Sequence, residues 1–73
     1  MASQNTDNVT TLIDEVDSAT TYVGIAPRST PTSSSGWSIQ RILESGTLTT
    51  ITYPNGNDGF LYKWDDRTTL TYS

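Results

Sequence analysis

Alternation between Trp37 and Glu44 is the feature that most restricts how this chain can fold. In WSIQRILE one set of side chains is mainly apolar and the next set mainly polar, the two-residue period of a strand with one buried face. Ser45-Gly46 then predicts a turn, and TLTTITYP predicts a returning strand that ends at Pro54, which lacks the N–H that pairing needs. One side should hold Trp37, Ile39, Arg41 and Leu43, and the other Ser38, Gln40, Ile42 and Glu44. The core is predicted to include Trp37, Ile39, Ile51 and Tyr53.

Composition favours strands elsewhere too. Thr and Ser are abundant, Ala and Leu are scarce, and β-branched and aromatic residues suit a pleated, half-exposed surface. We predict an all-β fold with about five short antiparallel strands in a compact small barrel or sandwich.

A second hairpin is predicted nearer the N-terminus. Its strands would be Thr10–Val16 and Thr20–Ala26, joined at Asp17-Ser18, whose side chains bond readily to nearby backbone. A helix in TTLIDEVDSA is the competing interpretation, because Leu12, Ile13 and Val16 also have a helical spacing.

Two segments look irregular. Residues 1–8 are polar and aperiodic and predict a flexible tail before a single small β domain at residues 9–73. Pro27–Gly36 holds two prolines and a run of Ser and Thr, which predicts an extended surface loop.

The C-terminal third mixes turns with strand-like runs. NGND at residues 55–58 predicts a left-handed turn, since Asn and Gly tolerate positive φ. GFLYKW resumes the chain, DDR interrupts it, and TTLTY is predicted as the last strand.

The chain is short for a domain that must bury a stable core. A domain of 73 residues buries only about 60–65% of the surface that it exposes when unfolded. It has no cysteine and no histidine, which excludes disulfides and the usual zinc, haem and iron–sulfur ligand sets. Small domains are otherwise stabilised by association. We therefore expect a homo-oligomer or a chain docked on a larger assembly.

Charge and hydropathy exclude two classes of partner. The net charge is −4, and the only cations are Arg28, Arg41, Lys63 and Arg67, whereas phosphate binding needs clustered Lys and Arg. No apolar run approaches the roughly 18–20 residues that span a bilayer, and MASQNTDNV lacks the features of a signal peptide. We therefore expect neither nucleic acid nor a membrane as a partner. The chain is expected to be made in the cytoplasm.

Two polar motifs suggest chemistry but favour structure. Asn55–Asp58 has the oxygen-rich side chains of a calcium loop, yet it lacks the acidic positions and the closing Glu, so a hairpin turn is favoured and a bound cation is left open. In WDDR, Asp65 and Asp66 are adjacent, and neighbours on a strand point to opposite faces. There we expect an Asp cap, an Arg67–carboxylate pair and Trp64 at the end of the core. No catalytic residue, cofactor or metal ligand is predicted, and the chain is not expected to be an enzyme.

Candidate contact residues come from two segments. Most aromatic side chains are needed for the core, and Tyr62, beside Lys63, is the candidate for an exposed ring that could bind a partner or a sugar. The Pro27–Gly36 loop is predicted either to lie across a neighbouring subunit or to be a solvated connector. The predicted interface residues are Pro27, Arg28, Thr30, Pro31, Tyr62 and Lys63.

The motifs TTYVGIAPRSTPTSSSGWSIQRI and ITYPNGNDGFLYKWDDRTTLTYS, which lie within residues 20–73, together resemble small proteins of tailed bacteriophages. The departure is in APRSTPTSS, where a Gly is expected in place of Arg28 or Ser29.

The resemblance implies a phage protein, either a structural part of the virion in contact with other virion proteins or an accessory factor, and it carries over no catalytic residue. Decoration or cementing of the capsid is the leading expectation, with a place on the tail or connector as the alternative. A carbohydrate-binding module for host surface glycans and an inhibitor of a host protein are the competing hypotheses.

Overall fold

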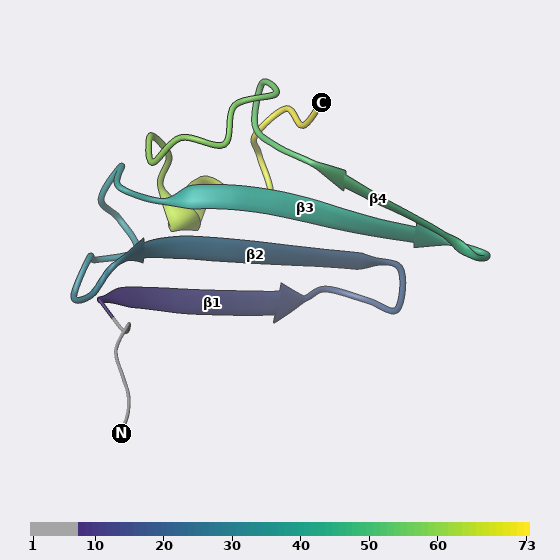
Figure 1. Cartoon of the computed structure of the whole chain (residues 1–73), viewed down its shortest axis with the longest axis horizontal. Helices are drawn as coiled ribbons and strands as arrows, with labels where there is room; N and C mark the ends of the chain where they lie inside the picture. The colour runs from purple at the N-terminus through teal and green to yellow at the C-terminus, as the bar shows by residue number, and fades with distance from the viewer. Residues whose placement is uncertain (1–7) are drawn as a thin grey trace.

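The computed structural model describes residues 8–73 and contains one open antiparallel sheet (Figure 1). Its strands are β1 (Val9–Glu15), β2 (Thr20–Pro27), β3 (Ser38–Ser45) and β4 (Leu48–Thr52). Each strand pairs with the next along the chain, so the order in the sheet is β1-β2-β3-β4. The predicted all-β class is confirmed. The tail expected at residues 1–8 lies outside the described residues, apart from Asn8.

The N-terminal hairpin is confirmed, and the helix alternative is wrong. The Asp17 carboxylate accepts hydrogen bonds from the backbone N–H groups of Ala19 and Thr20, both at 2.8 Å. An Asp that bonds its own turn in this way stabilises a tight reversal. The reversal sets the register in which Ile13 lies opposite Val23.

The central hairpin is also present, but its turn is one residue later than predicted. Ser45 pairs with Leu48, so the turn is Gly46-Thr47, and Gly46 has a φ of 61° that glycine adopts without steric cost. The predicted core position of Ile51 is wrong. Ile51 pairs with Ile42, and directly paired residues share a face, so it lies on the face opposite to Ile39.

Residues 53–73, here called the covering segment, include no strand. The predicted left-handed turn is confirmed by φ values of 52° at Asn55 and 70° at Gly56. Trp64–Asp66 forms one 3₁₀ turn, η1, and the end of the chain makes only an isolated bridge between Pro54 and Tyr72. The fifth strand and the closure into a barrel or sandwich are therefore not confirmed. No helix among residues 8–73 is long and apolar enough to cross a membrane.

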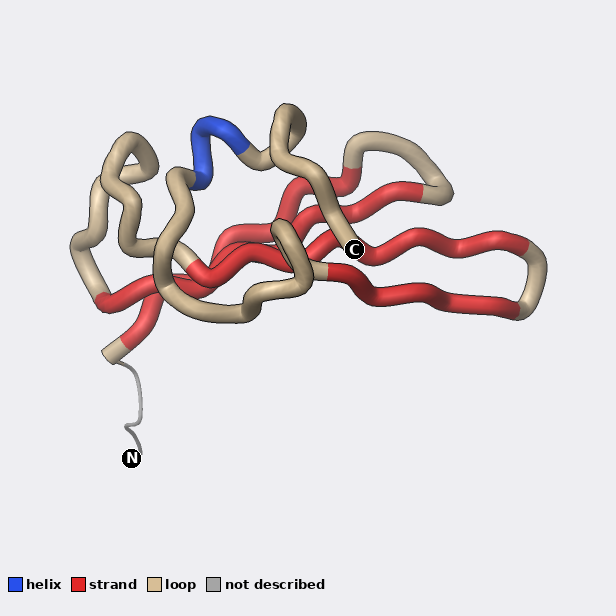
Figure 2. Tube along the Cα trace, turned by 90° about the horizontal axis from the view of Figure 1, so that it is seen from above, coloured by secondary structure: helices blue, strands red, loops and turns tan. Residues whose placement is uncertain are grey.

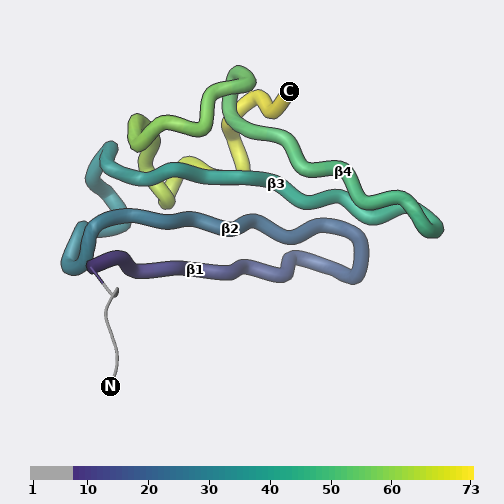
Figure 3. Tube along the Cα trace, in the orientation of Figure 1, coloured from purple at the N-terminus to yellow at the C-terminus, as the bar shows by residue number. Residues whose placement is uncertain are grey.

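The ends of the covering segment are held together. The backbone N–H groups of Tyr53 and Ser73 each donate to the other residue's carbonyl oxygen, at 3.3 and 2.9 Å, and the Asn55 N–H donates to Thr71. The last residues thus return to the chain that follows β4, as the trace in Figure 3 shows. Tyr53, which was predicted in the core, is half-buried.

The covering segment packs mainly on one face of the sheet; on the other face it makes a single contact near the loop after β2, where the Ser38 hydroxyl donates to the Asp58 carbonyl oxygen at 2.7 Å. Figure 2 shows η1 lying to one side of the strands, and the side chains that face it form the core. The buried members are Tyr22, Ala26, Trp37, Ile39 and Trp64, with Leu12, Tyr62, Leu70 and Tyr72 packed around them. We call this the covered face and the other the open face. The predicted core positions of Trp37 and Ile39 are confirmed, whereas from Gln40 to Leu43 every side chain of β3 is half-buried and the alternation in burial does not continue.

Gly24 allows Trp64 to lie on the sheet. A Cβ atom at Gly24 would collide with Cε3 of the Trp64 indole, and it would lie 2.6 Å from Cζ3 of that ring and 3.2 Å from Trp37. A glycine inside a strand often marks such a close approach. The two indoles meet at 6.0 Å between ring centroids and are tilted by 42°, a favourable aromatic geometry.

Arg67 attaches the covering segment to the far edge of the sheet. Its guanidinium bonds Asp14 of β1 through Nε and Nη2, both at 3.0 Å, and donates through Nη1 to the Trp64 carbonyl oxygen at 3.2 Å. It also lies 4.6 Å from the centroid of the Trp64 ring, within cation–π range. The predicted pairing of Arg67 with a carboxylate is confirmed.

The loop after β2 is folded rather than extended. Thr30 donates to the Pro27 carbonyl oxygen through both its N–H and its hydroxyl, at 3.1 and 2.6 Å. The Pro31 carbonyl oxygen accepts from the Ser34 N–H at 3.0 Å and from the Trp37 indole N–H at 2.9 Å. Ser29 has a φ of 72°, a conformation that favours glycine, at one of the two positions where the phage resemblance implies a Gly.

Gly24→Ala is expected to lower the free energy of unfolding by about 1–3 kcal/mol, because the added methyl group overpacks the Trp64 contact. Thermal unfolding followed by circular dichroism would measure this. Gly36→Ala is the matched control: its Cβ would lie 3.3 Å from Cγ2 of Thr30 and 3.8 Å from Oγ of Ser34, with no contact under 3.0 Å, so a loss well below that of Gly24→Ala is expected. Equal losses in the two variants would contradict the role given to Gly24.

Candidate functional site

The two segments predicted to form an interface meet at one end of the sheet. Trp37 and Tyr62 exchange backbone hydrogen bonds at 2.9 and 3.1 Å, and the Asp65 N–H donates to Thr32 at 3.1 Å. These bonds hold the chain around Tyr62 against the loop that follows β2. We call the exposed residues here the loop end; they are Pro27, Arg28, Pro31, Phe60, Leu61 and Lys63.

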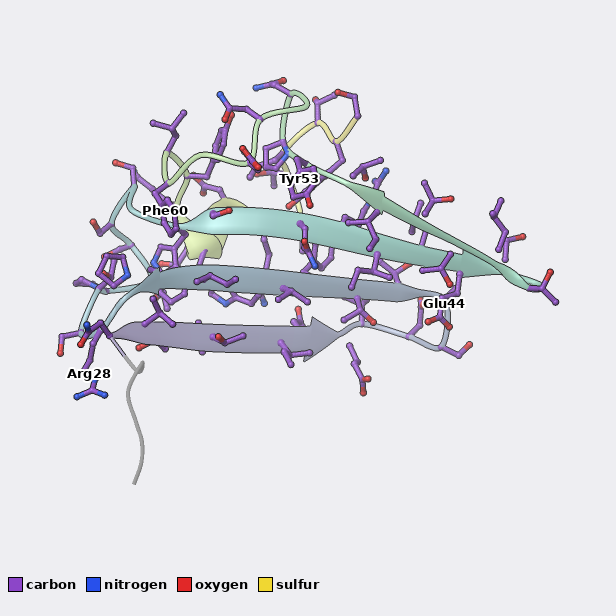
Figure 4. All side chains as sticks on the ribbon, in the orientation of Figure 1. Arg28, Glu44, Tyr53 and Phe60 are labelled. Atoms are coloured by element: carbon purple, nitrogen blue, oxygen red, sulfur yellow. The ribbon has the colours of Figure 1, made fainter. Side chains whose placement is uncertain are left out.

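The exposed aromatic residue at the loop end is Phe60 rather than Tyr62. The Tyr62 side chain is half-buried against the core, and its hydroxyl donates to the Pro54 carbonyl oxygen at 3.2 Å. Phe60 and Leu61 are each more than half exposed. Figure 4 shows Arg28 and Phe60 toward one end of the sheet and Glu44 at the other. Of the remaining predicted residues, Thr30 is half-buried and bonded within its own turn.

The acidic and amide motifs serve as turns. Asp65 and Asp66 are exposed, and η1 has no side-chain cap at its start, so the Asp cap expected there is absent. The carboxylate that does cap a turn is that of Asp17, between β1 and β2. In the turn after β4, Asn57 Oδ1 accepts the Gly59 N–H at 2.7 Å. Residues 8–73 contain no group of three or more His, Cys, Asp or Glu side chains placed to hold a metal ion, and they enclose no pocket.

A polar and aromatic cluster lies on the covered face beneath β3 and β4. Arg41 pairs with Thr52 across these strands, and its guanidinium lies 4.9 Å from the centroid of the Tyr72 ring. Tyr22 and Tyr72 meet at 5.7 Å. Arg41 Nε and Thr52 Oγ1 are buried without a hydrogen-bond partner in the described chain. The contacts of Tyr72 with Tyr22 and Arg41 hold the end of the covering segment against β2 and β3.

Burial raises the pKa of Tyr72 to about 12, and the nearby Tyr22 adds to the increase, whereas Arg41 and Arg67 oppose it. The Tyr72 hydroxyl donates to the Arg67 carbonyl oxygen at 2.7 Å, a bond that requires the neutral phenol.

The open face carries a row of apolar side chains that crosses the sheet. Ile13 pairs with Val23 across β1 and β2, and Ile42 pairs with Ile51 across β3 and β4. Val23 pairs with Gln40, which is two residues before Ile42, so Val23 and Ile42 are diagonal neighbours on the same face. Cross-strand and diagonal neighbours on one face are within side-chain contact range. One aliphatic stripe thus crosses all four strands, and Ile25 extends it along β2. We call these five residues the aliphatic stripe.

Three of the five side chains of the aliphatic stripe are exposed and two are half-buried. Ile13 is 66% exposed and Ile51 49%, Ile25 is also exposed, and Val23 and Ile42 are half-buried. Scattered apolar side chains are normal on a surface, whereas contiguous ones mark interaction sites. This face is therefore the second candidate site.

Sequence analysis did not single out the aliphatic stripe. Two pairs of adjacent apolar residues, Leu12-Ile13 and Ile42-Leu43, carried the signal. Successive residues of a strand point to opposite faces, so each pair makes both faces of the sheet apolar. A chain this short covers only one of them.

No protein-family model matches this sequence, and no curated protein or solved structure is significantly similar to it. The resemblance to phage proteins therefore stays a prediction.

Stability should fall in alkali because of Tyr72. The folded protein holds the phenol neutral up to about pH 12, whereas in the unfolded chain it ionises near 10. The contribution is thus complete below pH 10 and is lost as the pH rises from 10 to 12. Urea unfolding across this interval should show the decline, and Tyr72→Phe should flatten it.

At neutral pH, Tyr72→Phe should cost about 1 kcal/mol through loss of the bond to Arg67. Tyr53→Phe is the matched control, since it removes a hydroxyl outside this cluster. A decline that is as steep in Tyr72→Phe as in the parent chain would show that other groups cause it.

Proposed function

We propose that this chain is a non-enzymatic structural protein that binds the surface of a tailed-phage particle through its loop end. The observation that supports a binding role is that the loop end exposes two large apolar side chains, Phe60 and Leu61, and two cations, Arg28 and Lys63. These are two of only four cations in a chain of net charge −4.

Residue types at the loop end suit protein recognition. Exposed aromatic and Arg side chains are enriched among the residues that dominate binding energy. The backbone beneath them is already ordered by the bonds of Thr30, Pro31 and Trp37, and an ordered surface loses less conformational entropy on binding. The cations would meet an acidic surface of the partner.

The phage context comes from the sequence resemblance. Within it, decoration or cementing of the capsid shell is the proposed role, and a place on the tail or connector is the alternative location. The glycan-binding alternative is less well supported, because it needs exposed rings for stacking, and Phe60 is the only exposed ring among the described residues: Tyr22 and both Trp side chains are buried, and the other Tyr side chains are half-buried.

Particles purified through a density gradient should contain this polypeptide at a fixed ratio to the major capsid protein, or to a tail protein in the alternative. A Phe60→Ser, Leu61→Ser double variant should be lost from the particles at least tenfold, as expected when a binding site loses its apolar anchors. Quantitative mass spectrometry of the gradient fractions would measure the ratio.

Leu48→Ser is the control, since Leu48 is equally apolar and exposed but lies at the hairpin tip remote from the loop end. Particles that lack the polypeptide would refute the proposal, and particles that retain the double variant would refute the role of the loop end.

A further inference from the structure

We propose that the open face is covered by a second copy of this chain in a two-fold, face-to-face dimer. The two sheets would pack through their aliphatic stripes. Such a dimer would present two loop ends to a particle, but its formation does not depend on particle binding.

The chemistry of the open face selects a protein surface as its occupant. The aliphatic stripe consists entirely of Ile and Val, so it lacks the aromatic rings that stack on sugars or bases. The strand residues of this face include no cation that would bind phosphate; its charged members are Glu15 and Glu44. β-Branched side chains are those that pack well between two pleated surfaces.

The size of this face fits a dimer. The molecule measures 38 × 27 × 19 Å, so the rectangle that encloses its broad side is roughly 1,000 Å², an upper limit for the open face, and a stable interface buries about 800 Å² per partner. The covering segment already packs on the opposite side of the sheet, so a partner can pack only on the open face. A second copy is the partner always present with a matching open face, and a two-fold axis makes the contact self-complementary.

Charge determines how the two copies would be oriented. Glu15 and Glu44 both lie at the turn end of the sheet, and Figure 4 shows Arg28 at the opposite end. Two copies with strands running the same way would bring four carboxylates together, and like charges across an interface cost binding energy. A two-fold axis that lies in the interface and is perpendicular to the strands instead places each acidic end over the opposite end of the partner's sheet, where Arg28 lies, and keeps the carboxylates of the two copies apart.

Such packing would complete the expected sandwich between two chains. Aligned sheets pack about 10 Å apart with their inner side chains interdigitated. Each chain would supply one sheet, and the covering segments would lie on the two outer sides.

The solution mass of the whole chain, measured by light scattering and by sedimentation over a range of concentrations, should be twice the monomer mass of 8.0 kDa. Ile13→Lys and Ile51→Lys should each raise the dissociation constant by about tenfold or more. Far-ultraviolet circular dichroism should show that the dissociated variants remain folded. If they do not, Ile13→Thr and Ile51→Thr, which keep the β-branch, should show the same order of weakening.

Two control variants match these positions in exposure but lie off the open face. Leu48→Lys pairs with Ile13→Lys, both sites being 66% exposed, and Val16→Lys at 53% pairs with Ile51→Lys at 49%. Both controls should remain dimeric.

Three outcomes would overturn the proposal. The first is a folded monomer at every concentration, which would leave the face to a different protein. The second is equal dissociation in the controls. The third is a dimer sensitive to Ile13→Lys but not to Ile51→Lys, which would indicate edge pairing of β1 strands, because Ile51 lies on the opposite edge strand. Loss of the dimer with normal particle binding, or the reverse, separates this proposal from the function proposed above.

Discussion

The contact between the Trp64 indole and Gly24 is the interaction on which the rest of this structure depends. Gly24 leaves a space on β2 because it has no side chain. The Trp64 ring fills this space so closely that a Cβ atom would not fit. Trp37 packs against the same ring, and Arg67 extends the contact to Asp14 on the edge strand. The covering segment contributes no strand, so it is attached by side-chain packing together with a few backbone bonds, such as those between Tyr62 and Trp37, and not by a continuous ladder. Its placement therefore relies on packing density, which tolerates small changes in volume poorly.

Because the covering segment packs on the covered face, no segment of residues 8–73 packs over most of the open face. The core consists of five buried apolar residues, all gathered where the covering segment crosses the sheet. Ile13, Ile25 and Ile51 have the same hydrophobic character as the core residues but face away from it. An antiparallel sheet normally presents polar side chains on its solvated face. The composition of this open face is that of an inner layer, which is why its natural complement is another sheet.

The two candidate surfaces differ in a way that suits different partners. The open face is broad, aliphatic and almost uncharged, whereas the loop end is small and combines aromatic, aliphatic and cationic side chains over an ordered backbone. Broad apolar surfaces are typical of permanent homodimers, and mixed surfaces of contacts between separately folded proteins. The two surfaces can therefore act together in one structural protein, the first in its own assembly and the second in attachment.

The sequence by itself determined the local features. Asp17 specified the first turn, Asn55-Gly56 the left-handed turn, and the alternation from Trp37 to Glu44 the two faces of β3, because each depends on side-chain chemistry within a few residues. Only the tertiary structure decided which face would be covered, that Ile51 would be outside, and that the last residues would not form a strand. These outcomes depend on where residues 53–73 pack, and that placement is set by a space at Gly24 that no local pattern reveals. The exposure of Phe60 in place of Tyr62 has the same origin, since the backbone pairing of Tyr62 with Trp37 turns its ring toward the core.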